Sequence, residues 1–451
     1  MLATKLDCRI AKMSQVALFA RSVLCSGQQA AGVSVLRKAF LRAFNSSSST
    51  LQAEPLPVAS EPAPSVPRWI RELGVVRTDW TRDEVAEVYN TPLLDLVYRA
   101  ASVHRMYNDP SMVQRCTLLS IKTGGCPENC NYCSQSSHWS KDTGMKAEKL
   151  MDLEEVYQAA LRARDAGSTR FCMGAAWRGP SQVGQRQWER VLEMIRRIRG
   201  LGMEVCTTLG MLTPEQASQL RQAGLTAYNH NLDTSPEYYE KITSTRKYED
   251  RLTTLEAVRE AGISVCAGGI IGLGEGPQDR VGLIHQLATL PAHPESVPIN
   301  RLVAIKGTPL QDQAPPEGLD LVRCVATARV VMPRTVVRLS AGRLDLSRGD
   351  QALAFLAGAN SIFDGDKLLT TPNNDRNEDL AMFEQLGLRS RPAFLPYASG
   401  NETSRSFEDA GSGGGGGCGS TAAEAAPAAE AMGGGCCGGG AKKAAVGGGC
   451  C

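Results

Sequence analysis

Short apolar, often β-branched runs alternate with amphipathic segments from about residue 81 to residue 399. Runs of this length followed by a helical period predict strands that each lead into a helix. Eight segments fit strands: 117–121, 169–173, 204–209, 226–231, 264–271, 297–304, 336–340 and 361–363. The clearest predicted helices cover 153–166, 187–201, 214–223 and 248–261, and most end at an Ala-Gly or Leu-Gly pair, a common helix stop.

Eight strands separated by helices predict the α/β class, with a parallel sheet closed into a TIM (β/α)8 barrel. The alternation of strands and helices alone is also compatible with an open doubly wound sheet. Two further helices are expected before the first strand. Thr81 and Glu84 have the spacing of a capping box, and Thr91-Pro92 puts a proline at the first turn of the second helix.

The N-terminal segment has a composition unlike the rest. Residues 1–50 hold seven Lys or Arg against one acid, Asp7, and end in a serine run, 46–49. Basic, serine-rich and acid-poor composition is typical of an organelle transit peptide. We therefore expect residues 1–50 to direct the chain to the mitochondrial matrix, since the arginines favour mitochondrion over plastid. A merely disordered basic extension is the alternative.

The other boundaries follow from composition. Residues 51–79 are expected to be a linker, 80–399 the barrel with its N-terminal helices, and 400–451 a disordered tail, because 16 of the 45 glycines fall in the last 41 residues. The net charge is +2, and the leader accounts for +6 of it, so the remainder carries −4 and is not expected to bind nucleic acid. No apolar run is long enough for a membrane helix, so no membrane partner is expected.

Three cysteines follow the first predicted strand with the spacing C-x3-C-x2-C: Cys126, Cys130 and Cys133. Three thiolates leave one coordination position open on a metal centre, whereas a structural zinc or a simple ferredoxin cubane takes four protein ligands. His138 is a possible fourth ligand, so a Cys3His zinc site remains an alternative. Cys116 is expected at or before the start of the strand, toward the opposite mouth of the barrel, where its reach to the loop is poor.

Three more cysteines fall on separate predicted strands: Cys172, Cys206 and Cys266. A single strand cysteine is usually a small buried apolar residue, but three could converge inside a barrel if all point inward. Arg338 follows apolar residues of another strand, and an inward arginine needs an anionic partner such as a cluster of thiolates. An exposed arginine at a strand end is the alternative.

The cysteine loop resembles the signature of the radical S-adenosylmethionine (SAM) enzymes, in which a [4Fe-4S] cluster holds SAM at its open iron. Further segments make the chain similar to the biotin synthase family over nearly all of residues 80–395. They are GGCPENCNYCSQSS from Gly124, RFCMGAAWR from Arg170, YNHNLDTS from Tyr228, AGGIIGLGE from Ala267, KGTPL from Lys306 and VRLSAGR from Val337.

The resemblance implies site residues one by one. Cys126, Cys130 and Cys133 would hold the [4Fe-4S] cluster, and Cys172, Cys206, Cys266 and Arg338 would hold a deeper [2Fe-2S] cluster. SAM would be contacted by Tyr132, Ala175, Asn231, Asp233 and Ile270, and the substrate dethiobiotin by Asn231 and Asn300. Asn231 and Asp233, one residue apart, are expected to share one face of a strand.

The implied activity is that of a sulfurtransferase, which inserts sulfur into dethiobiotin to form biotin. The family also implies a reducing electron-transfer protein, iron–sulfur assembly factors and a homodimer. One alternative is another sulfur-inserting radical SAM enzyme such as a lipoyl synthase, which would need a second cubane with cysteines outside the barrel strands. A non-enzymatic metal-binding scaffold is the other alternative.

Overall fold

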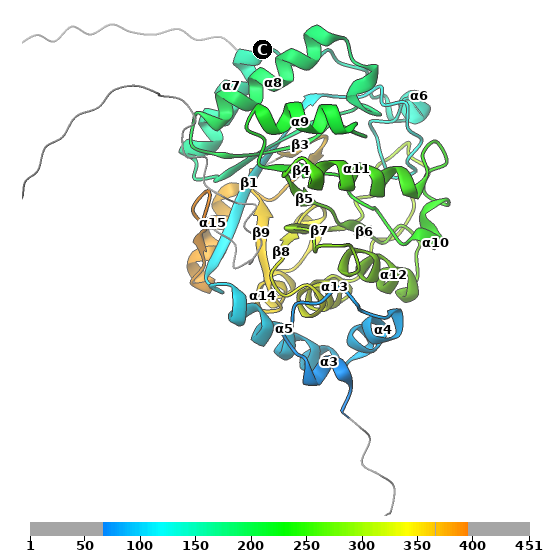
Figure 1. Cartoon of the computed structure of the whole chain (residues 1–451), viewed down its shortest axis with the longest axis vertical. Coiled ribbons are helices and arrows are strands. Elements are labelled where there is room, and N and C mark those ends of the chain that lie inside the picture. Colours follow the sequence, from blue (N-terminus) through cyan, green and yellow to red (C-terminus); the bar gives the residue numbers. More distant parts are fainter. Residues whose placement is uncertain (1–65, 366, 396–451) are drawn as a thin grey trace, which may run out of the picture. The chain divides into compact units, whose positions relative to one another are not determined.

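A computed structural model describes residues 66–365 and 367–395. Its central sheet is parallel throughout and closed, because β1 pairs with β2 on one side and with β9 on the other (Figure 1). The TIM barrel prediction is therefore confirmed, and the open doubly wound sheet is wrong. The barrel strands are β1 (Met112–Lys122), β2 (Arg170–Ala175), β3 (Glu204–Thr208), β4 (Ala227–Asn229), β5 (Ser264–Cys266), β6 (Gly269–Ile271), β7 (Ser296–Arg301), β8 (Val336–Leu339) and β9 (Ala359–Phe363).

The longer helices form a layer outside the barrel. Four of them match the predicted ranges within two residues: α7 (Leu153–Asp165), α8 (Gln185–Arg199), α9 (Pro214–Gln222) and α11 (Tyr248–Glu260). Capping boxes begin α7 at Asp152 and α9 at Thr213, because each side chain satisfies a free backbone N–H of the first turn. The other helices of this part are α6 (Ser140–Thr143), α10 (Pro236–Tyr239), α12 (Pro277–Ala288), α13 (Gly318–Val331), α14 (Arg348–Leu356) and α15 (Arg376–Leu386).

From residue 66 onward, three helices precede the barrel: α3 (Arg68–Arg71), α4 (Arg82–Asn90) and α5 (Leu93–Tyr107). Thr81 and Glu84 form the predicted capping box, and Pro92 is the N-cap of α5. Helix α4 contacts α12 and α13, and α5 contacts α13. Trp69 of α3 is buried, so a folded turn lies within the segment that was expected to be a linker.

Side chains alternate between two apolar layers, as strand geometry requires. Phe171, Val205 and Tyr228 belong to the large core between strands and helices. Their neighbours Cys172, Cys206 and Ala227 belong to a separate small cluster inside the barrel. The two faces of each strand therefore serve different purposes: one holds the helices and the other lines the interior.

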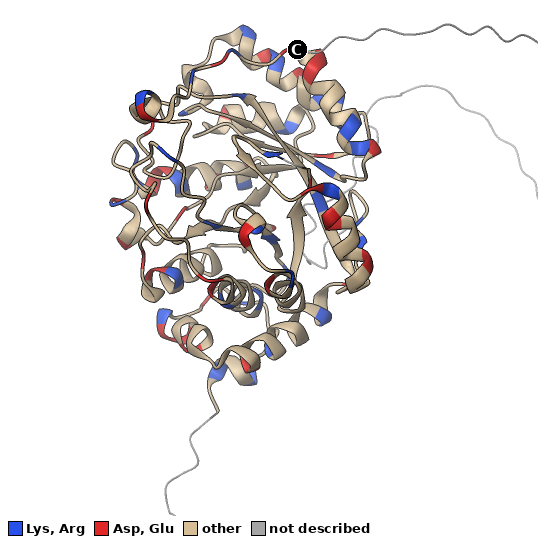
Figure 2. Cartoon of the chain, turned by 180° about the vertical axis from the view of Figure 1, so that it is seen from behind, with Lys and Arg blue, Asp and Glu red and all other residues tan. Residues whose placement is uncertain are grey.

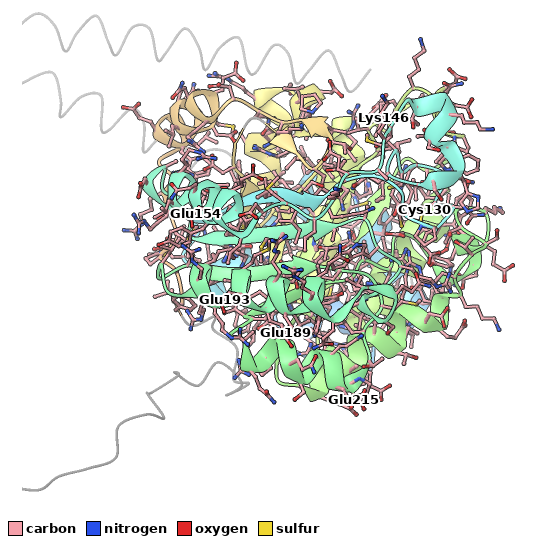
Figure 3. The ribbon with its side chains drawn as sticks, turned by 90° about the horizontal axis from the view of Figure 1, so that it is seen from above. Cys130, Lys146, Glu154, Glu189, Glu193 and Glu215 are labelled. Atoms are coloured by element: carbon pink, nitrogen blue, oxygen red, sulfur yellow. The ribbon has the colours of Figure 1, made fainter. Side chains whose placement is uncertain are left out.

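Charged side chains gather on the outer helices. Lys, Arg, Asp and Glu are interspersed over these helices (Figure 2), and exposed Glu154, Glu189 and Glu215 lie on α7, α8 and α9 (Figure 3). Within the described residues, no helix combines the length and apolar character needed to cross a membrane. The predicted transit peptide and the predicted disordered tail lie outside the described residues.

Two strands differ from their predicted ranges in ways that affect the site. The segment 264–271 is interrupted at Ala267-Gly268, because Pro298 of β7 has no N–H to donate to the ladder. Gly268 lies so close to Pro298 that a Cβ would be 2.0 Å from the Pro298 carbonyl oxygen. Strand β1 starts at Met112, five residues before the predicted start at 117. Cys116 is therefore in the middle of β1 and fully buried, and its expected position at or before the strand start is wrong.

Short strands complete the fold beyond β9. An antiparallel pair, β10 (Lys367–Leu368) and β11 (Thr371–Pro372), follows the last barrel strand and borders the barrel mouth. Strand β12 (Arg389–Ser390) returns to pair in parallel with the first residues of β1. Beyond it, the backbone N–H of Phe394 donates to Glu204, a buried carboxylate inside the barrel, so this segment covers the amino-terminal end of the barrel.

Candidate active site

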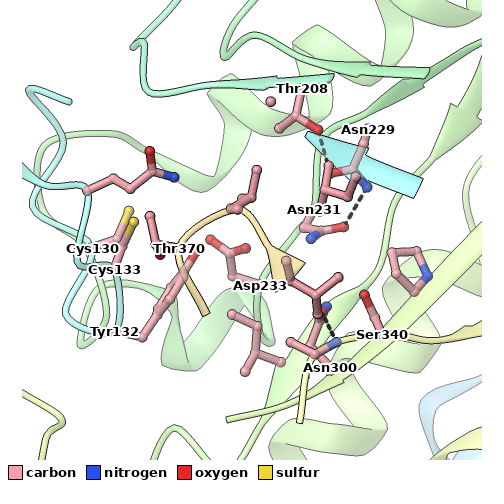
Figure 4. A pocket seen from close by; sticks show the side chains of 18 of the residues that line it. Cys130, Tyr132, Cys133, Thr208, Asn229, Asn231, Asp233, Asn300, Ser340 and Thr370 are labelled. Carbon is pink, nitrogen blue, oxygen red and sulfur yellow. Dashed lines mark hydrogen bonds between the residues drawn. The ribbon is translucent and has the colours of Figure 1, made fainter. Parts of the chain in front are cut away.

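A cavity of about 340 Å³ opens at the carboxyl ends of the barrel strands, the end where TIM barrels carry their active sites (Figure 4). It is lined by all but one of the residues that the resemblance implied: Cys126, Cys130, Tyr132, Cys133, Cys172, Ala175, Cys206, Asn231, Asp233, Ile270, Asn300 and Arg338. The exception is Cys266, which is fully buried, with Sγ 3.7 Å from Arg338 Nη1. The structure thus brings the predicted site residues together, whereas their roles stay predictions.

The loop after β1 carries Cys126, Cys130 and Cys133, which we call the loop thiols. Its entry needs two glycines: Gly124 and Gly125 have φ of 67° and 70°, and a Cβ on Gly124 would lie 2.6 Å from a backbone oxygen of Lys146. Backbone hydrogen bonds then close the loop, from Cys126 N to Gln135 O (2.9 Å) and from Ser137 N to Cys126 O (2.7 Å). The thiols are held by the loop's own backbone.

Glu128 and Asn129, inside the same loop, bind it to the segment before α11. Buried Glu128 pairs with Arg178, with Oε1 2.9 Å from Nη1. Asn129 Oδ1 accepts hydrogen bonds from the backbone N–H groups of Ser244 (3.0 Å) and Thr245 (3.2 Å). The loop is therefore anchored by the two residues that directly precede the middle thiol, Cys130.

Burial raises the pKa of all three loop thiols, and that of Cys133 to about 12. Any metal bound here must displace thiol protons, since the thiolate is the ligand. His138, the possible zinc ligand, is exposed, and its Nε2 lies 3.2 Å from the carbonyl oxygen of Pro127. Across residues 66–365 and 367–395, no group of three or more His, Cys, Asp or Glu side chains is placed to hold one metal ion. A cluster of several irons distributes its thiolates over different metal atoms.

Deeper in the barrel lie four buried cysteines of β1, β2, β3 and β5, which we call the barrel thiols. Cys172 lies close enough to Cys116 and Cys206, and Cys206 to Cys266, for each thiol to shift the pKa of its neighbour. Cys172 and Cys206 are direct partners in the strand register. The inward convergence expected for Cys172, Cys206 and Cys266 is present, and Cys116 is an unexpected fourth member.

Arg338 lies on β8 beside the barrel thiols and is 1% exposed, so the alternative of an exposed strand-end arginine is wrong. Its Nε donates to Ser361 Oγ (2.9 Å) and its Nη2 to Gln114 Oε1 (3.3 Å). Burial lowers the pKa of Arg338, but the negative charge available on Cys116, Cys266 and Cys172 raises it further, above its usual value. The site therefore pairs one fixed cation with several ionisable sulfurs.

The barrel thiols differ from one another in pKa, because each responds to its neighbouring thiols and to nearby arginines. Burial raises the pKa of Cys116, yet the hydrogen bond from Cys172 and the charges of Arg338 and Arg170 bring it down to about 6. Hydrogen bonds from Cys172 and Cys266 hold the pKa of Cys206 well below its ordinary value. The pKa values of Cys172 and Cys266 are raised in turn, first by these shared hydrogen bonds.

Between the loop thiols and the barrel thiols, the cavity wall carries amides (Figure 4). Asn231 Oδ1 accepts from Asn229 Nδ2 (3.1 Å) and from Gly268 N (3.2 Å), which leaves its own NH2 group to donate. Asn300 is fixed at both ends, since Nδ2 donates to Gly269 O (2.9 Å) and Oδ1 accepts from Ala341 N (3.2 Å). These side chains are preorganised before any ligand binds.

Asp233 reaches the cavity in a different way from that expected. Strand β4 ends at Asn229, and Asp233 lies in the following loop with φ of 67°, so the prediction that Asn231 and Asp233 share a strand face is wrong. The Asp233 carboxylate forms a buried ion pair with Arg251, whose Nε also donates to the Tyr239 hydroxyl (2.7 Å). Asn231 and Asp233 nevertheless line the same cavity.

The apolar part of the wall comes from Tyr132 and Ile270. Both pack against a small cluster of Ile242, Leu273 and Leu302. Ala175, at the end of β2, also lines the cavity. This wall offers a flat apolar surface next to the loop thiols.

Sequence reasoning missed three groups of this site. Asn229 alternates with Asn231 and could have been found from that spacing, and it links Thr208 Oγ1 (3.2 Å) to Cys266 Sγ (3.3 Å). Arg251 belongs to the outer helix α11, where nothing in the pattern marks it as facing the cavity. Thr370 lies beyond the last barrel strand and lines the cavity through β10 and β11.

Comparison with known families and proteins agrees with this geometry. Residues 120–287 match the Radical SAM superfamily, and residues 298–389 match the Biotin and Thiamin Synthesis associated domain. The chain is 61% identical over 317 residues to the mitochondrial biotin synthase of Arabidopsis thaliana, covering 70% of this chain and 83% of that one. It is 55% identical over 325 residues to biotin synthase of Schizosaccharomyces pombe, covering 71% and 88%.

Solved structures share the fold at low identity. Methylornithine synthase superposes with a TM-score of 0.58 at 18% identity, covering 69% of this chain and 94% of that one. HydG, a maturase of the [FeFe]-hydrogenase, gives a TM-score of 0.59 at 18% identity, covering 69% and 72%. The closed barrel, the cysteine loop at its mouth and the identity to these relatives together establish that this chain belongs to the biotin synthase family of radical SAM enzymes.

Proposed function

We propose that this chain inserts sulfur into dethiobiotin to form biotin, using the loop thiols for a [4Fe-4S] cluster and Cys172, Cys206, Cys266 and Arg338 for a [2Fe-2S] cluster. Radical SAM membership itself implies the [4Fe-4S] cluster and SAM. The single observation that supports the finer proposal is the presence of two groups of thiols at two depths of one barrel, with a cavity between them.

When bound, the [4Fe-4S] cluster supplies the electron that cleaves SAM, and the [2Fe-2S] cluster supplies the sulfur atom. The chain's own residues bind and orient. The free NH2 group of Asn231 and the fixed amide of Asn300 would hold the polar ring of dethiobiotin. Asp233 would accept from the SAM ribose, and Tyr132, Ala175 and Ile270 would contact the adenosyl group.

Apolar side chains deep in the cavity would keep water away from the reacting carbon atoms. Leu118, Phe363 and Leu368 border both the cavity and the barrel thiols. Excluding solvent and other hydrogen donors protects a reactive intermediate while the substrate is held in position.

Anaerobic reconstitution with iron and sulfide tests the proposal. We expect two spectroscopically distinct clusters per chain and conversion of dethiobiotin to biotin under reducing conditions. Cys266→Ala should keep SAM cleavage and lose biotin formation, whereas Cys126→Ala should lose both. Cys324→Ala, at a buried thiol of α13 away from the cavity, is the matched control and should keep both activities.

Equal loss of SAM cleavage and biotin formation in Cys266→Ala would contradict the division between the two thiol groups. A single cluster per chain in the unaltered protein would contradict the [2Fe-2S] assignment. Turnover of an octanoyl substrate in place of dethiobiotin would favour the lipoyl synthase alternative.

The proposal extends to location and partners. The Arabidopsis relative is named mitochondrial, and residues 1–50 are basic and acid-poor, so we propose the mitochondrial matrix for this chain. A reducing electron-transfer protein, iron–sulfur assembly factors and a homodimer are further expectations from the family. A fluorescent protein carrying residues 1–50 should enter mitochondria, and a signal restricted to plastids or cytosol would contradict the assignment.

A further inference from the structure

Cys116 gives the deeper site one thiol more than the three proposed ligands. It lies at an inward position of β1, is fully buried, and packs beside the Cys172 side chain. In the small apolar cluster inside the barrel it packs with Cys172 and Cys206. Four sulfurs from four different strands are therefore gathered in one region of the interior.

Cys116 also lies close to Arg338, because the two side chains share both of their oxygen partners. Ser361 Oγ is 3.7 Å from Cys116 Sγ and 2.9 Å from Arg338 Nε. Gln114 Oε1 is 3.5 Å from Cys116 Sγ and 3.3 Å from Arg338 Nη2. The thiol and the guanidinium thus reach the same edge of the group of barrel thiols.

The two side chains differ strongly as metal ligands. A guanidinium has five N–H donors and no acceptor, whereas four thiolates are the common ligand set of a [2Fe-2S] cluster. We propose that Cys116 is a fourth sulfur ligand for iron at the barrel thiols, able to occupy the coordination position otherwise assigned to Arg338. The inference rests on the proposed [2Fe-2S] site.

The chemistry of this ligation balances without an oxidant or reductant. A bond forms between Cys116 Sγ and iron, the thiol proton is released, and the oxidation state of the iron does not change. Arg338 then acts as a buried counter-charge and hydrogen-bond donor to the sulfurs. It already has this contact with Cys266 Sγ at 3.7 Å.

Anaerobically reconstituted Arg338→Ala, Cys116→Ser and the double variant Arg338→Ala/Cys116→Ser test the inference. Iron and sulfide per chain, Mössbauer spectra and visible absorption are measured. Arg338→Ala should keep the [2Fe-2S] iron within about 20% of the unaltered protein, with a spectrum of sulfur-only ligation. The double variant should lose at least half of that iron. Cys324→Ser is the matched control for replacing a buried thiol.

A second measurement identifies the iron ligands directly. Full-length Arg338→Ala, with and without its clusters, is alkylated anaerobically after brief denaturation, and the modified cysteines are identified by mass spectrometry. Cys116 should be protected at least fivefold by bound iron, as Cys172 and Cys206 are. Equal labelling of Cys116 in both samples would overturn the inference.

The outcomes separate this inference from the proposed function. Absence of the second cluster in the unaltered protein would remove the [2Fe-2S] proposal and the inference with it. A second cluster with identical iron content and spectra in Arg338→Ala and the double variant would overturn the inference alone. Loss of that cluster already in Arg338→Ala would do the same, because Cys116 would then be unable to replace Arg338.

Discussion

Asn229 Nδ2 lies 3.3 Å from Cys266 Sγ and 3.1 Å from Asn231 Oδ1. One amide therefore contacts a barrel thiol and a side chain of the cavity wall at the same time. Thr208 Oγ1 donates to the Asn229 oxygen (3.2 Å), which fixes the orientation of the amide. The placement of the proposed substrate contact and the environment of the proposed sulfur ligand are thus set by the same residue.

Replacing Asn229 with alanine should affect both neighbours. The Asn231 amide would lose one of two partners that hold its oxygen, and a hydrogen bond of this kind contributes about 1 kcal/mol. We expect KM for dethiobiotin to rise about fivefold to tenfold, together with a shift in the visible spectrum of the deeper cluster. Steady-state kinetics and absorption spectroscopy measure these effects. Exposed Asn377→Ala should change neither, and an unaltered spectrum in Asn229→Ala would contradict the contact with Cys266.

The buried pair of Asp233 and Arg251 should be sensitive to loss of one partner. Asp233→Asn leaves a buried guanidinium without its carboxylate, which typically costs about 3–5 kcal/mol. We expect the urea midpoint of unfolding to fall accordingly, along with SAM binding measured by calorimetry. Glu237→Gln, which removes an exposed partner of Arg82, should cost less than about 1 kcal/mol. Similar losses in the two variants would contradict the buried character of the first pair.

His104 makes stability depend on pH. Burial, helped by the charges of Arg329 and Arg105, lowers its pKa to about 3, and neither ring nitrogen has a hydrogen-bond partner. The unfolded state takes up a proton below about pH 6.5 and the folded state does not, so the free energy of unfolding falls as the pH falls from 6.5 toward 3. At pH 5 the loss from this residue is about 2 kcal/mol relative to pH 7.

Urea unfolding at pH 7, 6 and 5 checks this dependence. His104→Leu should lower the pH slope by close to one proton, while exposed His138→Gln should leave the slope nearly unchanged. The pKa of His230 is also well below its ordinary value, through burial, and gives a remaining slope of the same sign. A slope that is equal in His104→Leu and the unaltered protein would contradict the prediction.

Gly268 is required where the two parts of the interrupted strand meet β7. A Cβ at this position would lie 2.0 Å from the Pro298 carbonyl oxygen and 2.9 Å from its carbon, both backbone atoms. We expect Gly268→Ala to destabilise the fold by several kcal/mol, about 3 or more, and to displace Asn231, whose Oδ1 accepts from Gly268 N. Gly349→Ala, in the first turn of α14 with only ordinary contacts, should leave the unfolding midpoint unchanged or raise it slightly.

The sequence was informative where local rules decide the structure. Helix α9 ends within one residue of its predicted end at Ala223, as its Ala-Gly stop predicts, and the other three predicted helices match within two residues. The position of Cys172, Cys206 and Cys266 on separate predicted strands also allowed the hypothesis that they converge inside the barrel. These signals depend only on neighbouring residues along the chain.

Features that depend on contacts between distant segments could not be read in this way. The break at Gly268 is caused by Pro298, thirty residues later in the chain. The predicted position of Cys116 was wrong because the polar residues Gln114 and Arg115 hid the start of β1. Both are buried through partners far along the chain, since Gln114 donates to Glu204 and Arg115 pairs with Asp364. A buried polar pair cannot be recognised until its second member is known.

The boundary between the two matched families, between residues 287 and 298, falls between α12 and β7, inside a closed ring of strands. The second family is therefore no separable module, since it contributes β7, β8 and β9, without which β1 has no neighbour on one side. A chimera that exchanged this portion between relatives would transplant Asn300 and Arg338 together with a third of the wall. An exchange of this portion between two relatives should therefore give a folded protein only where the strands and side chains of the two portions pack against each other.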